Sequence, residues 1–318
     1  MKNYQFLSEM KNFVNKKSIN FSLNLLVALL IFSCNSTSKT VATNAEVAVV
    51  KEVPLENSLL WKISGNGLEK PSYLYGTIHM TCNYKLSDKM ARAFAETDQI
   101  ALEIDMDDPT LQAKMMKSMM MQDGKTIKSI LSEEDYTTLA AFFKENVGMN
   151  LEMLNAMKPF AVTAMLISKM VPCTTPGSYE AEFMKIAKEQ KEEVEGLETV
   201  ESQMAIFDSI PYKDQLDDLV KMAKEGLDES KAEFEKLTAL YDKEDINGLM
   251  KIMTESEGMT GKFKEELLDN RNQNWIPVIA EKSKEKATFY GVGAMHLAGE
   301  QGVIKLLRKA GFTVAAVK

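Results

Sequence analysis

Residues 73–79 read Tyr-Leu-Tyr-Gly-Thr-Ile-His, and residues 289–296, near the other end of the chain, read Phe-Tyr-Gly-Val-Gly-Ala-Met-His. Each stretch is a β-like run of apolar and aromatic residues that leads directly into Gly-x-x-His. A glycine at the end of a strand permits a tight turn and a close approach of the backbone. We therefore expect Gly76 and Gly293 to place His79 and His296 at the carboxyl edge of one β-sheet, where ligands bind in α/β proteins.

Short β-like runs lie near both ends of the chain, and long amphipathic stretches fill its middle. Residues 60–64, a Gly65-Asn66-Gly67 turn and residues 72–75 indicate a hairpin. This pattern predicts an α/β fold: a single domain with a central β-sheet built from N- and C-terminal segments and a large helical middle insert. The other expected strands are 98–104, 193–195, 287–292 and 312–317, and the expected helices lie at 86–97, within 109–170, at 179–190, within 200–255, at 262–282 and near 300–310.

Composition excludes several classes of protein. The 318 residues are 45% hydrophobic and carry a formal net charge of −8, so the bulk of the chain is not disordered and is poorly suited to binding nucleic acid. The chain contains two histidines and three cysteines. These counts exclude a three-histidine metal site, a zinc ribbon and a scaffold of several disulfides.

The N-terminus resembles an export signal. Residues 21–33 form an apolar run that follows Lys11, Lys16 and Lys17 and ends at Cys34. The run is short for a membrane span, and Ser33 before Cys34 resembles the lipobox of bacterial lipoproteins. We expect 1–33 to be a lipoprotein-type signal peptide, 34–57 a flexible tether and 58–318 the folded domain.

Under this interpretation Cys34 carries the lipid. The protein would be exported and attached to the bacterial envelope, on the periplasmic side or at the cell surface, with the lipid anchor as its only contact with the membrane. An ordinary signal peptide cut nearby, or a short anchor helix, is the alternative.

A carboxylate accompanies the two histidines. Glu103 lies at the end of the strand expected at 98–104, and Asp105 follows it, either on the opposite face of a longer strand or in the next loop. Two imidazoles and one or two carboxylates at one cleft suit a divalent metal that keeps a coordination position open for water.

These segments resemble the TraB/GumN family. The resemblance runs from Leu60 to the end of the chain, and the quoted segments are 60–63, 73–79, 102–105, 193–199 with Gln203, 271–272, 291–297, Gly299, Gly302, 306–307 and 311–312. Tiki proteins of that superfamily are metal-dependent proteases that use paired Gly-x-x-His motifs and a glutamate with manganese- or cobalt-type ions. The resemblance implies the same chemistry for this chain.

Position by position, the resemblance matches His79 and His296 to the motif histidines and Glu103 to the acid after the second strand. Glu198, Gln203 and Arg271 match recurrent polar positions, and Glu180 stands where relatives often have an aspartate after a glycine.

We expect His79, His296 and Glu103 to hold a divalent Mn, Co or Zn ion, with a carboxylate such as Glu103 accepting a proton. Arg271 would stabilise a developing oxyanion or bind a substrate carboxylate, and Glu198 would orient a histidine.

Two further features leave alternatives open. Cys82 and Cys173 could form a disulfide in an exported protein or remain free thiols. The methionines at 115, 116, 119, 120 and 121 could fill a core, or form a soft apolar surface that grips a peptide or a lipid.

The sequence therefore favours a metal-dependent hydrolase, a peptidase acting on a peptide or protein. The alternative is a non-catalytic envelope lipoprotein that binds a metal, a haem-like ligand or a peptide in the same cleft. A third class, an envelope scaffold that uses its acidic helical middle, would not depend on the cleft.

Overall fold

The computed structural model describes residues 54–255 and 262–318. The expected signal peptide, Cys34 and nearly all of the expected tether lie outside the described residues. Within the described part of the chain, every helix is too short or too polar to cross a membrane.

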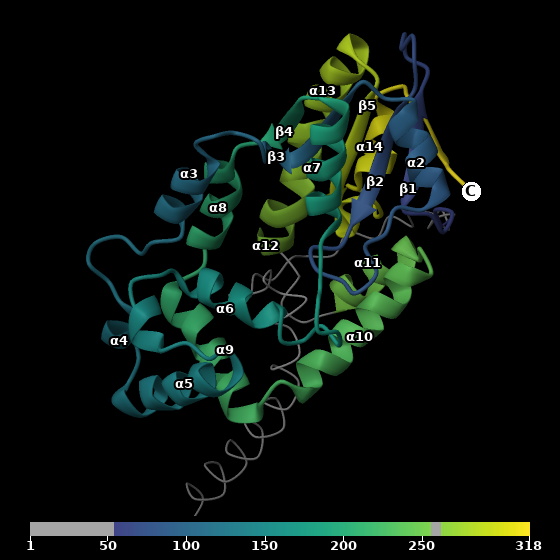
Figure 1. Cartoon of the computed structure of the whole chain (residues 1–318). Helices are drawn as coiled ribbons and strands as arrows, with labels where there is room; N and C mark the ends of the chain where they lie inside the picture. The colour runs from purple at the N-terminus through teal and green to yellow at the C-terminus, as the bar shows by residue number, and fades with distance from the viewer. Residues whose placement is uncertain (1–53, 256–261) are drawn as a thin grey trace, which may run out of the picture.

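A six-stranded sheet forms the centre of the fold (Figure 1). The strand order is β4-β3-β5-β2-β1-β6. The first four strands in that order pair in parallel, and β1 pairs antiparallel with both β2 and β6. The strands are β1 (Leu60–Ser64), β2 (Ser72–Thr77), β3 (Gln99–Ile104), β4 (Val194–Glu198), β5 (Thr288–Gly293) and β6 (Thr313–Ala316).

This sheet confirms the predicted assembly from both ends of the chain. β5, from the C-terminal part, lies between β3 and β2 and pairs Gly293 with Thr77. The expected hairpin forms β1 and β2, with Leu60 opposite Tyr75. Because β2, β3, β4 and β5 run in parallel, their carboxyl ends meet at one edge of the sheet.

Helices cover both faces of the sheet. Phe289 and Tyr290 are neighbours on β5, so their side chains point to opposite faces. Phe289 stacks on Phe94 at 3.8 Å between ring centroids and also contacts Phe183, whereas the Tyr290 hydroxyl donates to the carbonyl of Ile279. These contacts place α2 (Asp88–Ala95) and α7 (Tyr179–Gln190) on one face and α13 (Asn270–Glu285) on the other.

The predicted helical insert fills the middle of the chain and has its own apolar cores. α5 (Glu133–Asn146) lies within the helical stretch expected at 109–170, and it is capped by Ser132, whose hydroxyl accepts from the backbone N–H of Asp135. The remaining helices are α3 (Leu111–Ser118), α4 (Ile127–Ile130), α5 (Glu133–Asn146), η2 (Leu151–Leu154), α6 (Pro159–Ile167), α8 (Val200–Asp208), α9 (Tyr212–Glu225), α10 (Asp228–Asp242), α11 (Ile246–Glu255), α12 (Lys262–Lys264), the π-turn η3 (Glu265–Asp269), η4 (Ala294–His296) and α14 (Val303–Lys309).

The strand expected at 193–195 is longer than its sequence indicates. β4 runs from Val194 to Glu198 because it pairs in parallel with β3 as far as Ile104. At Gly196 a Cβ atom would lie 2.7 Å from the backbone nitrogen of Asp105, so only glycine fits this close approach. The consequence is that Glu198 ends a strand at the same edge of the sheet as Glu103.

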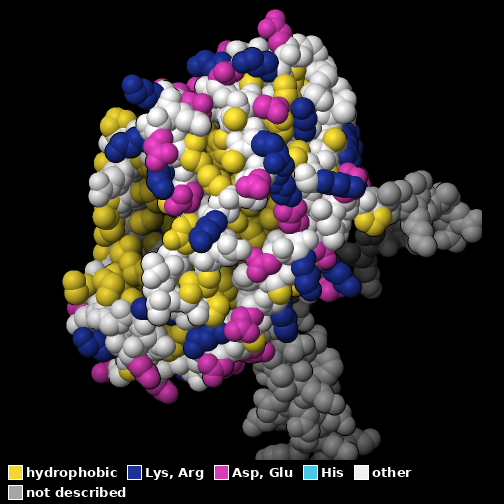
Figure 2. Space-filling model, turned by 45° about the vertical axis from the view of Figure 1, so that its right-hand side comes forward, with side chains coloured by type: hydrophobic (Ala, Val, Ile, Leu, Met, Phe, Trp, Pro, Cys, Tyr) yellow, Lys and Arg dark blue, Asp and Glu magenta, His cyan; other side chains and the backbone are white. Residues whose placement is uncertain are grey.

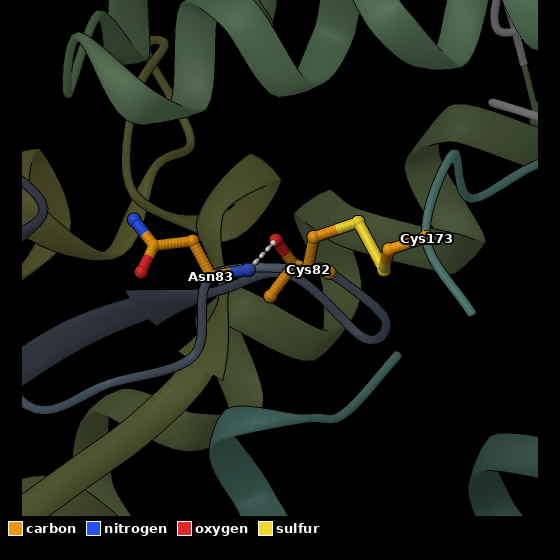
Figure 3. The surroundings of a disulfide bond; sticks show 4 residues. Cys82, Asn83 and Cys173 are labelled. Carbon is orange, nitrogen blue, oxygen red and sulfur yellow. Dashed lines mark hydrogen bonds between the residues drawn. A yellow bond between two sulfur atoms is a disulfide. The ribbon is translucent and has the colours of Figure 1, made fainter. Parts of the chain in front are cut away.

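A disulfide joins Cys82 and Cys173 (Figure 3). Cys82 lies in the loop after β2, and Cys173 lies between α6 and α7. Beside the disulfide, Thr81 and Gly177 exchange two backbone hydrogen bonds of 2.9 Å. The loop that carries His79 is therefore attached to the segment that leads from the insert back to the sheet.

The first prediction concerns this crosslink. Reduction of the wild-type protein should lower its free energy of unfolding by about 3 kcal/mol, because a long loop is no longer closed in the unfolded chain. Replacement of both cysteines, Cys82→Ser with Cys173→Ser, should cause the same loss. Denaturant titrations with and without dithiothreitol measure both. The double variant is the control, since the reductant should not change its stability; equal stability of the reduced and oxidised wild type would contradict the prediction.

Candidate functional site

The glycines of the two Gly-x-x-His stretches act through their small size. Neither is among the described residues with positive φ, so both are needed for the close approach of the backbone and not for a left-handed conformation. A Cβ atom on Gly76 would lie 2.6 Å from a Leu297 side-chain carbon and 3.0 Å from Ala294 Cα. On Gly293 it would lie 3.3 Å from a carboxylate oxygen of Glu103. The missing side chains let the turn after β5 pack against the end of β2.

His296 follows β5 and is buried, with 4% of its surface exposed. Its Nδ1 lies 2.5 Å from Asn272 Oδ1, and its Nε2 lies 3.1 Å from Arg271 Nη1. Because a guanidinium only donates, Nε2 is the acceptor and Nδ1 carries the proton. Asn272 Nδ2 donates to the backbone oxygen of Gln301, which fixes the amide in the orientation that this tautomer needs.

Arg271, on α13, joins the two carboxylates at the edge of the sheet. Its Nη2 donates to Glu103 at 2.6 Å and to Glu198 at 2.5 Å, and its Nε also donates to Glu198. Its Nη1 donates in addition to the carbonyl of Leu267, in the π-turn that precedes α13. All three charged side chains are largely buried. The guanidinium therefore holds together the ends of β3 and β4.

Glu103 has several hydrogen-bond donors. One carboxylate oxygen accepts from the backbone N–H of Gly293 at 2.7 Å and lies 3.8 Å from His296 Nε2. The other accepts from Arg271 and from the Gln203 side chain. Burial opposes ionisation, but the Arg271 charge and these donors hold the pKa of Glu103 well below its usual range. Glu103 is thus an anion at neutral pH.

Arg271 also contacts the buried side chains of Glu198 and His296, and the pKa values of these two groups shift in opposite directions. Burial outweighs the attraction of Arg271 and raises the pKa of Glu198. Burial and the Arg271 charge together lower the pKa of His296 to about 3. At neutral pH the His296 ring is therefore uncharged, and its Nε2 lone pair can bind a cation.

His79 and Glu180 line the same cavity as the cluster. This cavity of about 520 Å³ is lined by His79, Glu180, Glu103, Arg271 and His296 together with many apolar side chains. The His79 ring nitrogen Nδ1 lies 3.9 Å from a Glu180 oxygen, and 78% of the His79 side chain is exposed. The structure thus brings Glu103, Glu198, Arg271, Gln203 and His296 into one hydrogen-bonded cluster and leaves His79 beside Glu180.

Asp105 does not join the cluster. It lies in the loop after β3, where one of its oxygens accepts from the backbone N–H groups of Asp107 and Asp108. The sequence left two positions open for Asp105, and the structure places it in the loop.

Asn272 and Trp275 complete the site, and sequence reasoning gave neither a role. The Trp275 ring lies 4.5 Å from the His296 ring and 4.8 Å from the Arg271 guanidinium carbon. Trp275 follows Arg271 by four residues, which places both on one face of a helix. The four-residue spacing from Arg271 on a helix is the sequence signal that could have identified Trp275.

The donor types suit a divalent metal, although their arrangement does not yet form a complete site. A neutral imidazole whose other nitrogen is held by an amide oxygen, and an ionised carboxylate, are ordinary ligands for Mn, Co or Zn. Among residues 54–255 and 262–318, no three His, Cys, Asp or Glu side chains are close enough to hold one ion. The Arg271 guanidinium contacts both His296 and Glu103.

The fold and the site define an α/β protein with a His–carboxylate–Arg cluster at the carboxyl edge of its sheet. Residues 59–316 match the TraB/PrgY/gumN family. The chain belongs to this family.

Its curated relatives include three animal proteins. Metalloprotease TIKI2 of Danio rerio is 20% identical over 322 residues, which cover 81% of this chain and 60% of that protein. Metalloprotease TIKI1 of Danio rerio is 21% identical, and the match covers 81% of this chain and 63% of that protein. Metalloprotease TIKI1 of Xenopus tropicalis is 22% identical, and the match covers 91% of this chain and 67% of that protein. The chain thus spans about three-fifths of the first two relatives, and no solved structure matches it.

The second prediction tests the buried ion pairs. Arg271→Met should lower the free energy of unfolding of the metal-free protein by about 3–5 kcal/mol, because two buried carboxylates lose their cation. Denaturant titration measures the loss. Arg92→Met is the matched control: Arg92 is exposed on α2, so its loss should change stability by no more than about 0.5 kcal/mol. Equal stability of the two variants would refute this account of Arg271.

The third prediction concerns pH. The pKa of His296 is about 3 in the folded protein and near 6.5 in an unfolded chain. Between these values the unfolded state binds a proton that the folded state does not bind, so stability falls as the pH falls. The metal-free protein should lose about 2 kcal/mol from this group between pH 7 and pH 5.

Denaturant titrations at several pH values check this slope. The difference in this slope between the wild type and His296→Gln isolates the histidine, because Asp218 and Glu233, whose pKa values burial raises to about 8 and about 7, contribute in the opposite direction in both proteins. His79→Gln, which removes the other imidazole of the chain, is the matched control. Equal slopes in the wild type and in His296→Gln would contradict the prediction.

Proposed function

We propose that this protein is a metal-dependent peptidase in which His79, His296 and Glu103 hold a divalent Mn, Co or Zn ion. One observation carries the proposal: the neutral His296 ring and the ionised Glu103 carboxylate line a cavity large enough for a peptide segment. The family match and the names of the relatives support the same class of reaction.

The residues have separate tasks in this proposal. A bound divalent ion supplies Lewis acidity, which makes water nucleophilic at neutral pH. Glu103, whose pKa is held low, is a poor proton acceptor and is better suited to binding the cation. Glu180 lines the cavity beside His79 and is the carboxylate placed to accept a proton.

Arg271 and its neighbours act as positioning residues. Arg271 keeps Glu103 ionised and holds it beside His296, and Glu198 holds the guanidinium from the other side. Asn272 fixes the His296 tautomer so that Nε2 faces Arg271 and Glu103. The Arg271 contact with His296 must open for Nε2 to bind a metal.

That contact also favours the second candidate function, a non-catalytic binding protein. The guanidinium itself donates to the Nε2 lone pair and neutralises part of the carboxylate charge. A cavity of this kind could hold a peptide or a haem-like ligand without cleaving it. Turnover of peptides separates the two functions.

We propose the same location as the sequence predicts. Residues 1–33 would direct export, and Cys34 would carry the lipid that attaches the domain to the bacterial envelope. The disulfide between Cys82 and Cys173 supports this location, because disulfides persist in oxidising compartments outside the cytoplasm.

The fourth prediction tests the metal. The wild-type chain, loaded with Mn²⁺ and freed of unbound ion, should contain about one ion per chain and should cleave peptides. The double variant His79→Ala with His296→Ala should lose both properties, because it removes every imidazole of the chain. Elemental analysis and mass spectrometry of peptide digests measure the two effects.

A matched control removes two polar side chains elsewhere. Gln122 and Gln190 are exposed and lie outside the cavity lining, so Gln122→Ala with Gln190→Ala should keep both metal and cleavage. Unchanged metal content in the double histidine variant would exclude the proposed site. Metal binding without cleavage of any peptide would favour the non-catalytic alternative.

A further inference from the structure

Most of the cavity beside the charged cluster is apolar. Its polar end is formed by Glu103, Arg271 and His296 from the edge of the sheet and α13. On the face shown in Figure 2, hydrophobic side chains gather in a hollow of the surface. The apolar residues that bear on the argument are Met119, Phe160, Met204, Phe207, Phe234 and Met295.

One apolar wall comes from the helical insert. Phe160 on α6 and Phe207 on α8 stack with ring centroids 4.6 Å apart, and both line the cavity. Met295 comes instead from the turn after β5, next to His296. The insert therefore contributes apolar groups to the cavity that Glu103, Arg271 and His296 also line.

The methionine-rich segment contributes to this wall only in part. Met121 is buried in a core of the insert, Met116 is 59% exposed, and Met119 lines the cavity. The two interpretations left open by the sequence, core packing and an apolar surface, thus each apply to different methionines. Flexible methionine side chains can adapt to apolar groups of different shapes.

The charges at the polar end favour a neutral ligand. The guanidinium of Arg271 at this end is already paired with the Glu103 and Glu198 carboxylates, and the Glu180 carboxylate lines the same cavity. A fatty acid or an acidic side chain would therefore meet no excess of positive charge, whereas a peptide amide beside an apolar side chain would meet polar groups at one end and apolar walls at the other.

We infer that the cavity is a specificity pocket for peptides that carry a large apolar side chain, such as Phe, Leu or Met, next to the bond that is cleaved. This inference rests on the proposed peptidase function and adds the class of substrate. The apolar wall of the insert holds the side chain, and the peptide bond lies against the polar end formed by the sheet.

The first experiment maps cleavage. The full-length chain, supplied with Mn²⁺, is incubated with a peptide mixture of diverse sequence, and the cut bonds are identified by mass spectrometry. Matched peptides are then synthesised with Phe, Ala or Asp at the position found beside the cut. The value of kcat/KM should be at least about tenfold higher for Phe than for Ala, and lower for Asp than for Ala.

The second experiment fills the pocket. Ala164, on α6, is exposed and lines the cavity, so Ala164→Phe should narrow the cavity. α6 carries no residue of the charged cluster. The Phe peptide should lose at least about tenfold in kcat/KM, and the Ala peptide should change by less than about threefold. Ala141→Phe, at an exposed site on α5 outside the lining, should leave both values unchanged. A structural defect would lower the value of kcat/KM for both peptides together.

The outcomes separate the two levels of the proposal. Cleavage with equal kcat/KM for the Phe, Ala and Asp peptides overturns the specificity pocket and leaves the peptidase function standing. A defect in Ala164→Phe that is equal for the Phe and Ala peptides also overturns the pocket. Absence of any peptide cleavage by the Mn²⁺-loaded chain overturns the peptidase function and this inference with it.

Discussion

The rest of the structure depends on the insertion of β5 between β3 and β2. A strand from the C-terminal part of the chain pairs in parallel with two strands from the N-terminal part, and β4 extends the same parallel set. This pairing aligns the carboxyl ends of four strands. It is the reason that the Gly293 N–H reaches Glu103 and that His296 lies beside it, although 190 residues separate Gly293 from Glu103 in sequence.

Electrostatics then give two glutamates at this edge different properties. Arg271 contacts both Glu103 and Glu198, yet its charge and the Gly293 N–H keep Glu103 ionised, while burial dominates at Glu198. The same guanidinium and the same burial keep His296 uncharged. A neutral ring therefore lies beside a carboxylate anion, and one guanidinium contacts both.

The helical insert does more than lengthen the chain. It supplies the apolar wall opposite the charged cluster through residues such as Phe160 and Phe207, and the Cys82–Cys173 disulfide fixes the connection between this insert and the loop that bears His79. The insert also reaches the cluster itself, because the Gln203 amide on α8 donates to both Glu103 and Glu198. The sheet and the insert therefore share the site.

The sequence by itself determined the α/β class, the sheet built from both ends, and the positions of His79 and His296 after strands and of Glu103 at the end of one, because apolar periodicity and the paired Gly-x-x-His stretches are local signals. It also placed Arg271 and Glu198 among the candidates. Only the tertiary structure decided that Arg271 bridges the two glutamates, that Asn272 and Trp275 hold His296, and that His79 lies beside Glu180. The physical reason is that hydrogen bonds, burial and pKa shifts arise between residues far apart in the chain, and no local pattern encodes which of the many acidic side chains will meet the guanidinium.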